Sequence, residues 1–186
     1  MILLLMVAAV TVADDPILVL GPALAKQLHA SPAVSGWFIA ALGAGTVLGS
    51  FRRSRHQPTL RLAAMALAAL ALFMLLFVNA HAVWIGIVAA IGAGVSCLVA
   101  NSVTRAVLAE RAGDEIAAVM AVWAIAWAGS KPIASLIDGA LGTLIGPQWT
   151  GLILATPAVI PILVLALTPK ARLAALRGVG AGPETA

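Results

Sequence analysis

The chain has 186 residues, of which 62% are hydrophobic and only 10% are charged, and its formal net charge is +4. A mean hydropathy of +1.09 excludes an ordinary soluble domain, in which about half of the residues are apolar and about a quarter are charged. The basic residues lie in small clusters beside apolar runs and offer no basic face on a soluble domain, so nucleic-acid binding is excluded as well. We therefore expect a polytopic membrane protein, whose first partner is the lipid bilayer.

Six apolar runs follow one another along the chain. Ala and Leu dominate them and none alternates apolar with polar residues, which favours helices over barrel strands. The sequence predicts an all-α integral membrane fold with six transmembrane helices in residues 1–169 and a disordered cytoplasmic tail in residues 170–186. The runs are residues 2–25, 33–51, 60–79, 82–104, 116–145 and 148–168.

The distribution of basic residues predicts the orientation of these spans. The third and fifth connections contain no Lys or Arg, and the first contains only Lys26. By the positive-inside rule, the second connection, the fourth connection and the C-terminus are cytoplasmic, and six spans then place the N-terminus in the cytoplasm too. The residues that carry this signal are Arg52, Arg53, Arg55, His56, Arg61, Arg105, Arg111, Lys170, Arg172 and Arg177.

The start of the chain allows two interpretations. The first apolar run begins directly at Met1 without a flanking basic residue, so we expect the sequence to begin partway into a longer protein. Alternatively, residues 1–13, "MILLLMVAAVTVA", are a cleaved signal peptide, which leaves Asp14 as the N-terminus and five spans behind it. The absence of a basic segment and the return of apolar residues in "ILVLGPALA" speak against cleavage. Sequencing the mature N-terminus distinguishes the two.

Asp14 and Asp15 interrupt the first apolar run and are followed directly by Pro16. A charge inside a span costs about 2.5–3.5 kcal/mol on insertion scales, so such residues are functional candidates. Adjacent helix residues point about 100° apart, so one acid can face a cavity while the other contacts a neighbouring helix. Repulsion between them favours one protonated carboxyl, as a proton carrier requires. The alternative is that the acids cap a helix that restarts at Pro16.

The fifth run contains Lys131, directly before Pro132, and Asp138 seven residues later. That spacing returns to nearly the same helix face about 10 Å further along, so the two can share a stripe but cannot form a tight pair in an unbroken helix. Lys131 needs a counter-charge, for which Asp14 or Asp15 is available, or it binds an anionic substrate. The alternatives are that Lys131 extends to an interface and that Asp138 lies at the outer end of its span.

Two further pairs share helix faces. Asn101 and Arg105 lie four residues apart at the cytoplasmic end of the fourth run and are candidates for a gate or an interface contact. Trp123 and Trp127 have the same spacing, so Trp127 is a candidate for stacking on a flat or cationic substrate, or for packing between helices. The remaining tryptophans are expected to be interfacial anchors; they are Trp37, Trp84 and Trp149.

Residues with metal or catalytic chemistry are sparse. Cys97 is the single cysteine and is expected to face lipid or a helix, which excludes a disulfide or a thiolate metal site within one chain. No spacing fits a zinc site, a phosphate loop, a Ser-His-Asp set or a dinucleotide turn, so we expect no cofactor, no metal and no enzymatic activity. The small residues repeat at helical spacing and predict close helix contacts; they are Ala41, Gly45 and Gly49, and Gly142 and Gly146.

Three stretches resemble bacterial drug-exporter-like members of the major facilitator superfamily. "GWFIAALGAGTVLGSFRRSRHQP" resembles their eighth helix and the basic connection after it. "VTRAVLAERAGDEIAAVMAVWAIAWAGSKPIASLIDGALGTLIGPQW" resembles their tenth-to-eleventh helix region, and "LLLMVAAVTVADDPILVLGPALA" resembles the seventh helix. The resemblance covers residues 2–169. The chain departs from the family in lacking the loop acid in "GSFRRSRHQP", in lacking an Arg in "GDEIAAV", and in having Lys131 where small residues are usual.

This resemblance implies the C-terminal half of a twelve-helix transporter, with two inverted three-helix repeats, in the bacterial cytoplasmic membrane. The expected function is secondary active transport, as proton-coupled efflux of a small molecule, with Asp14, Asp15 and Lys131 as coupling or substrate contacts. The other wall of the site comes from a missing N-terminal half or from a second chain. The alternative function is an orphan six-helix bundle that binds or assembles with another membrane protein without transport.

Overall fold

The computed structural model describes residues 16–53, 59–146, 148–153 and 156, and these residues form helices and short connections, with no strand among them. Four of the helices, α3 to α6, are long and apolar enough to cross a membrane. They match the second to fifth apolar runs, so the all-α membrane-type fold is confirmed in this part of the chain, while the number of six spans stays a prediction. The elements are α2 (Pro16–Gln27), α3 (Ala33–Arg53), α4 (Leu60–Val78), α5 (Val83–Ala112), η1 (Gly113–Glu115) and α6 (Ile116–Leu144).

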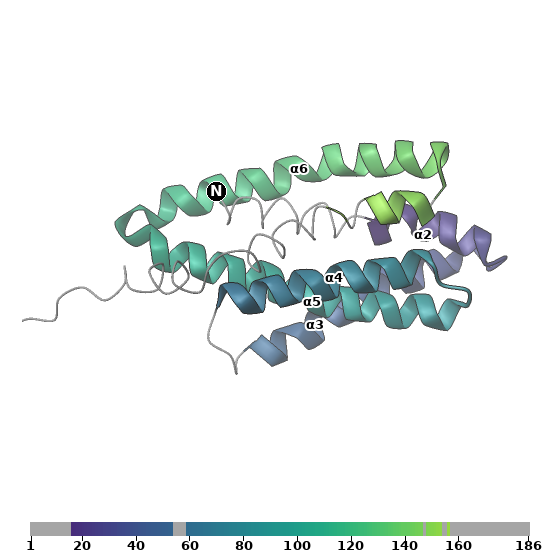
Figure 1. Cartoon of the computed structure of the whole chain (residues 1–186), viewed down its shortest axis with the longest axis horizontal. Helices are drawn as coiled ribbons and strands as arrows, with labels where there is room; N and C mark the ends of the chain where they lie inside the picture. Colours follow the sequence, from purple (N-terminus) through teal and green to yellow (C-terminus); the bar gives the residue numbers. More distant parts are fainter. Residues whose placement is uncertain (1–15, 54–58, 147, 154–155, 157–186) are drawn as a thin grey trace, which may run out of the picture.

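The helices alternate in direction, and their connections gather at two ends of the bundle (Figure 1). The α2–α3 and α4–α5 connections and the C-terminal end of α6 lie at one end, which we call the Lys26 end. The α3–α4 and α5–α6 connections lie at the other, which we call the Gly113 end. This alternation is the one that the charge pattern predicts, since it places the second and fourth connections on one side and the first, third and fifth on the other.

Local sequence explains where the helices stop. At the end of α2, the Ala30 amide donates to the Ala25 carbonyl (3.0 Å) and the His29 amide to that of Lys26 (3.1 Å), while His29 has a φ of 51°. These two bonds around a left-handed residue form a Schellman ending, in which glycine is the usual occupant. At the start of α4, the Leu62 amide donates to Thr59 Oγ1 over 3.2 Å, which satisfies one free donor of the first turn.

Helix α5 is longer than its apolar run predicts, because it continues to Ala112 instead of ending at residue 104. The added residues, "RAVLAERA", are mostly good helix formers; three of them are charged and none is a helix breaker. The helix ends only before Gly113, whose φ of 50° is accessible to glycine at little cost. A hydropathy run therefore marks the segment suited to lipid, and the helix extends beyond it.

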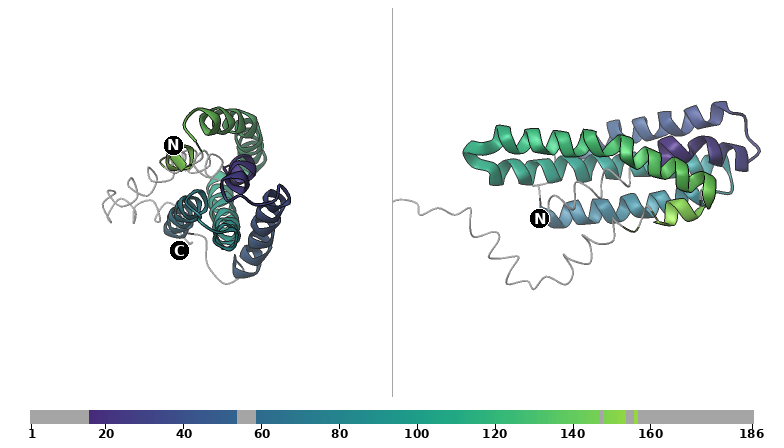
Figure 2. Two further views of the ribbon diagram at one scale, coloured as in Figure 1. Left: turned by 90° about the vertical axis from the view of Figure 1, so that its right-hand side faces the viewer. Right: turned by 90° about the horizontal axis from the view of Figure 1, so that it is seen from above.

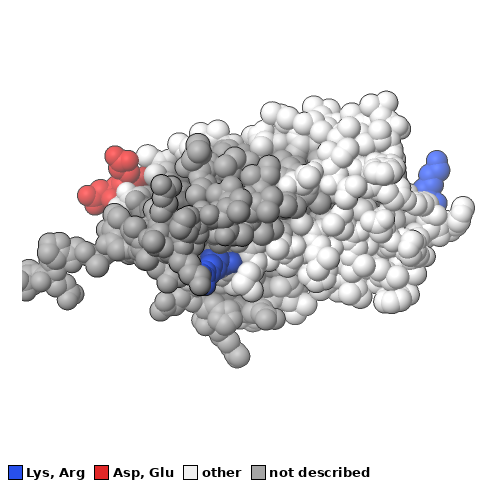
Figure 3. All heavy atoms as spheres, in the orientation of Figure 1, with Lys and Arg blue, Asp and Glu red and all other residues white. Residues whose placement is uncertain are grey.

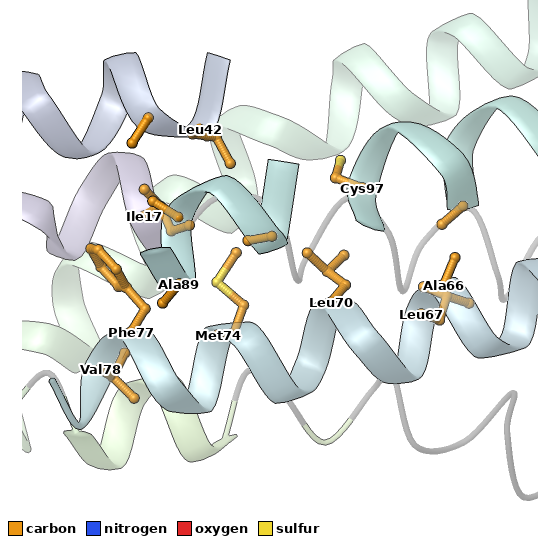
Figure 4. Packing of buried hydrophobic residues seen from close by; sticks show 14 of the residues in the cluster. Ile17, Leu42, Ala66, Leu67, Leu70, Met74, Phe77, Val78, Ala89 and Cys97 are labelled. Atoms are coloured by element: carbon orange, nitrogen blue, oxygen red, sulfur yellow. The ribbon is translucent and has the colours of Figure 1, made fainter. Parts of the chain in front are cut away.

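The apolar core lies among α2, α3, α4 and α5. Helix α4 contributes Leu67, Leu70, Met74 and Phe77, which are buried and point towards the neighbouring helices (Figure 4). Phe77 also meets Phe38 of α3 edge to face, with ring centroids 5.1 Å apart and planes at 84°. Aromatic pairs favour this geometry, and each contributes about 0.5–1.5 kcal/mol beyond the area it buries.

Helices α3 and α5 touch through their backbones. A Cβ atom on Gly45 would overlap the carbonyl oxygen of Ile91, and one on Gly94 would lie 2.9 Å from the Thr46 amide nitrogen. One turn further along, a Cβ on Gly49 would lie 3.1 Å from the Val95 carbonyl oxygen. The close approach predicted from the Ala41, Gly45 and Gly49 spacing is therefore confirmed at the two glycines, and at Gly45 and Gly94 a Cβ atom would overlap backbone atoms of the facing helix.

The second small-residue pair has two different roles. A Cβ on Gly142 would lie 2.9 Å from Leu20 Cδ2, so this glycine brings α6 close to α2, as its spacing predicts. Gly146 lies in the turn after α6 with a φ of 84°, and the nearest atom to its Cβ position is Gln148 Oε1 at 3.8 Å. The expectation of a close helix contact at Gly146 is wrong, because this residue provides a left-handed turn instead.

Helix α6 lies at the edge of the bundle, as the end-on view shows (Figure 2). It contacts α5 and α2, while its other side is open, with large apolar side chains such as Ile125, Leu136 and Leu144 exposed. Such a surface on a helix of this length is suited to lipid. One face of α6 is therefore left for the interior of the molecule, and that face carries the polar residues.

Candidate functional site

The inward face of α6 carries aromatic and charged residues at helical spacing. Trp123, Trp127 and Lys131 follow one another at intervals of four residues and are half-buried, and Asp138, seven residues beyond Lys131, is fully buried. Residues between them, such as Leu136, are exposed. The helix is continuous through Pro132, so Lys131 and Asp138 lie on one stripe and are separated by about 10 Å along the helix axis, as their spacing predicts.

The two indoles stack on each other, with ring centroids 5.7 Å apart and planes within 9° of parallel. The Arg105 guanidinium carbon lies 4.5 Å from the centroid of Trp123, and Lys131 Nζ lies 4.9 Å from that of Trp127. We call the set Arg105, Trp123, Trp127 and Lys131 the cation–indole column. A cation over an indole face gains about 0.5–1 kcal/mol when exposed and about 2 kcal/mol or more when desolvated.

The α5–α6 hairpin positions Arg105 over Trp123. The two helices run antiparallel through the connection at Gly113, and Arg105 and Trp123 are equally far along the chain from Asp114. Their side chains therefore reach the same level of the hairpin. The sequence analysis named Arg105 as a gate or interface candidate and placed Trp123 on one face with Trp127, but it did not pair Arg105 with Trp123. The equal distance of the two residues from the polar break "AGDE" is the signal that indicates the pairing.

The faces of both indoles are filled. Centroids only 5.7 Å apart leave no room for a cation between the rings, so Arg105 and Lys131 take the two outer faces. The hypothesis that Trp127 stacks on a flat or cationic substrate stays a prediction, and in this structure its ring meets Trp123 and Lys131. What the rings still offer is their polar edge: Nε1 of Trp123 and Nε1 of Trp127 are both buried and have no hydrogen-bond partner.

The charged residues of the site differ in their surroundings. Arg105 forms no ion pair with any carboxylate in the described parts of the chain, and the face of Trp123 is its recorded contact. Lys131, Ser135 and Asp138 each have a further interaction partner, so none of these three is isolated. Asn101 is half-buried one turn before Arg105 on the same face of α5, which is consistent with the predicted pairing of their positions.

Asp14 and Asp15 lie outside the described residues, so their role as counter-charges for Lys131 stays a prediction. His56 and the tail from residue 170 onward lie outside them as well. Cys97 is buried in the helical core, as expected for a helix-facing cysteine. Within residues 16–53, 59–146 and 148–153, His, Cys, Asp and Glu form no group that could hold a metal ion.

Exposed tryptophans mark the Lys26 end of the bundle. Trp37 near the start of α3, Trp84 at the start of α5 and Trp149 after α6 are all exposed, and their elements meet at that end (Figure 1). Indoles at one level of an apolar bundle are typical of a membrane–water interface. At the opposite end, Figure 3 shows acidic side chains gathered where α5 turns into α6, and the exposed acids there are Glu110, Asp114 and Glu115.

In comparisons with known proteins, no family model, no curated protein and no solved structure matches the chain.

Proposed function

We propose that this chain is one half of a secondary active transporter of the major facilitator type, which exports a small molecule in exchange for protons. The observation that carries the proposal is the polar stripe of α6, where Lys131 and Asp138 lie on the shielded face of an otherwise apolar helix. Ionisable residues at membrane depth are rare and line substrate or ion pathways.

Helix lengths support a position for this stripe in the bilayer. Helix α3 has 21 residues, which at the helical rise is about 31 Å and matches a hydrocarbon core of about 30 Å. With Trp37, Trp84 and Trp149 at one interface, Lys131 and Asp138 both fall inside the core, and Arg105 falls near the opposite interface. The positive-inside rule makes the Gly113 end cytoplasmic, since Arg105 and Arg111 lie towards it.

The proposed coupling uses the acids of the interior. Asp138 is fully buried on α6, and the sequence adds Asp14 and Asp15 on the first span. A carboxyl in such a place binds a proton when it faces one side of the membrane and releases it when it faces the other. Rocking of this kind needs a second wall, which we propose is another six-helix half or a second chain.

A transport assay in intact cells tests the proposal. Cells that express the chain are loaded with carboxyfluorescein, an organic anion, or with ethidium, an organic cation, and efflux is followed by fluorescence with and without a protonophore. We expect protonophore-sensitive efflux of at least one dye, and at least a tenfold slower rate for Lys131→Gln and Asp138→Asn. Asp14→Asn and Asp15→Asn test the coupling role of the first span in the same assay.

The matched control is Leu136→Ala, which changes an exposed residue of the same helix and should leave efflux unchanged. Equal efflux from the wild type, Lys131→Gln and Asp138→Asn would remove the polar stripe from the mechanism. Cells expressing the chain that retain both dyes as well as empty cells do would reject transport by the chain alone.

A second candidate function is an assembly partner that transports nothing. It is favoured by the outer face of α3, where the Cβ positions of Gly36 and Gly43 have no atom within 4 Å. Small residues on an exposed helix face let a helix of another protein approach closely. Purification in mild detergent distinguishes the candidates, since an assembly partner should co-elute with another membrane protein and show no dye efflux.

A further inference from the structure

We infer that the cation–indole column binds the anionic group of a small organic anion, such as a carboxylate, sulfonate or phosphate, and rejects organic cations. The inference rests on the proposed function in one respect only, in taking this column as the place where the substrate contacts α5 and α6. It names the substrate class, which the polar stripe by itself leaves open.

The first argument for an anionic ligand is the hydrogen-bonding capacity of the two indoles. An indole nitrogen can donate a hydrogen bond but cannot accept one, and Nε1 of Trp123 and Nε1 of Trp127 are buried without an acceptor. Two donors in this condition, on adjacent turns of one helix, match a ligand that brings acceptor oxygens. The oxygens of a carboxylate, sulfonate or phosphate accept at short distance and more strongly than neutral groups.

Charge is the second step. Arg105 is permanently protonated, and no ion pair neutralises it in the part of the chain that the structure describes. Lys131 lies at the other end of the column and has a further interaction of its own, so the charge argument rests on Arg105. An aromatic site binds an organic cation through an open ring face, but here both outer faces are already covered by the protein's own cations. A cationic ligand would meet repulsion without a face to stack on.

The third argument is the depth of the column in the membrane, which distinguishes a lipid headgroup from a soluble organic anion. Trp123 and Lys131 are eight residues apart on α6, so the column runs about 12 Å along the helix. The phosphate of a lipid headgroup at the interface would reach Arg105, whereas Trp127 and Lys131 lie one and two turns deeper. An anion that engages both indole donors must enter the column, which favours a soluble organic anion over a headgroup.

Binding of a matched pair of ions tests the inference. The full chain is placed in nanodiscs of zwitterionic phosphatidylcholine and titrated with benzenesulfonate or phenyltrimethylammonium, which have similar size and opposite charge. Tryptophan fluorescence reports binding in a background where Trp37, Trp84 and Trp149 are replaced by Phe, so that only the column emits. Calorimetry on the unsubstituted chain gives a second readout if that background does not fold.

We expect saturable binding of benzenesulfonate and none of phenyltrimethylammonium. Arg105→Gln should weaken benzenesulfonate binding at least tenfold, Arg105→Lys much less, and Leu136→Ala not at all. By calorimetry on the otherwise unsubstituted chain, Trp127→Phe should also weaken it at least tenfold, because it keeps a ring and removes only the N–H donor.

Three outcomes would overturn the inference: binding of phenyltrimethylammonium as tight as that of benzenesulfonate, no binding of benzenesulfonate, or binding that Trp127→Phe leaves unchanged. Nanodiscs of phosphatidylglycerol test the headgroup, since binding lost in that lipid and insensitive to Trp127→Phe assigns the site to lipid and rejects the inference. Anion binding in a chain that exports neither dye supports the inference and rejects only transport. Efflux of ethidium without benzenesulfonate binding supports transport and rejects the inference.

Discussion

Helices α3, α4 and α5 form one region of the molecule and α6 forms a very different one. In the first region, α5 packs closely against both neighbours, and Gly45 and Gly94 bring the backbones of α3 and α5 into contact. In the second, α6 contacts α5 and α2 along one face and leaves its other side open. The charged residues of α3, α4 and α5 all lie towards the Gly113 end of these helices, whereas α6 carries Lys131 and Asp138 within its apolar length.

The difference indicates that the two regions have different roles: α3, α4 and α5 hold the bundle together, and α6 carries polar residues within its apolar length. Backbone contact at Gly45 and Gly94 fixes the positions of α3 and α5, and the buried polar residues of α5 are small; they are Ser96, Ser102 and Thr104. The cation–indole column spans the boundary, because Arg105 belongs to α5 and its partner Trp123 to α6. Substitutions in the first region should therefore lower stability more than substitutions in the second, which should chiefly change function.

The largest effect is expected from filling the α3–α5 contact. Gly45→Val places side-chain atoms where the Ile91 carbonyl lies, and a backbone neighbour cannot repack, so we expect a loss of about 3 kcal/mol or more. The measurement is thermal unfolding and size-exclusion chromatography in detergent. Gly43→Val, two residues away with nothing within 4 Å, is the control; equal behaviour of the two would mean that α3 and α5 are not in backbone contact.

A smaller effect is expected from breaking the column at its centre. Trp127→Leu removes the stack on Trp123 and the face that holds Lys131, each worth about 1 kcal/mol. We expect a loss of about 1–2 kcal/mol in thermal unfolding. Trp149→Leu, at an exposed indole, should cost clearly less. If both substitutions cost the same, the column does not contribute to stability.

The contact between Arg105 of α5 and Trp123 of α6 is expected to contribute still less to stability. A double-mutant cycle of Arg105→Gln and Trp123→Leu isolates the cation–indole contact between α5 and α6, which is worth about 0.5–1 kcal/mol at an exposed site. Arg105→Lys keeps the charge and should retain part of the coupling. A coupling energy of zero would show that the two helices meet without this contact.

The smallest effect, with the opposite sign, is expected at the end of α2. His29 has a φ of 51°, where glycine is favoured, so His29→Gly should raise stability by about 0.5 kcal/mol. His81→Gly changes an exposed histidine that has no positive φ and should give no gain. A loss of stability in His29→Gly would mean that the imidazole contributes contacts that outweigh the strain.

The sequence predicts the helices of this bundle well because hydropathy and helix breakers act locally. The runs at 33–51 and 60–79 agree with α3 and α4 to within two residues. The end of α5 differs by eight residues because hydropathy measures affinity for lipid and "RAVLAERA" is helical but charged. Gly146 shows a similar limit, since spacing alone does not distinguish a helix contact from a turn.

The sequence predicts which residues of the site share a helix face, but it does not predict which residues of different helices meet. Spacing places Trp123 and Trp127 on one face and Lys131 and Asp138 on a shared stripe, and both expectations are confirmed. The approach of Arg105 to Trp123 depends on the register of the α5–α6 hairpin, which is a non-local property. That contact also places a guanidinium over one face of Trp123, which spacing alone leaves open.

The contact at Gly45 and Gly94 is made by backbone atoms, which have no rotamers, and this limits how α3 and α5 can move relative to each other. A joint made of side chains can slide by switching among side-chain conformers, whereas carbonyl and Cα atoms in contact offer no second arrangement. Helices α3 and α5 therefore move together as one rigid body. Any relative displacement of α6 must be absorbed elsewhere, and the nearest degree of freedom is the backbone of Gly113, which joins α5 to α6 at a positive φ.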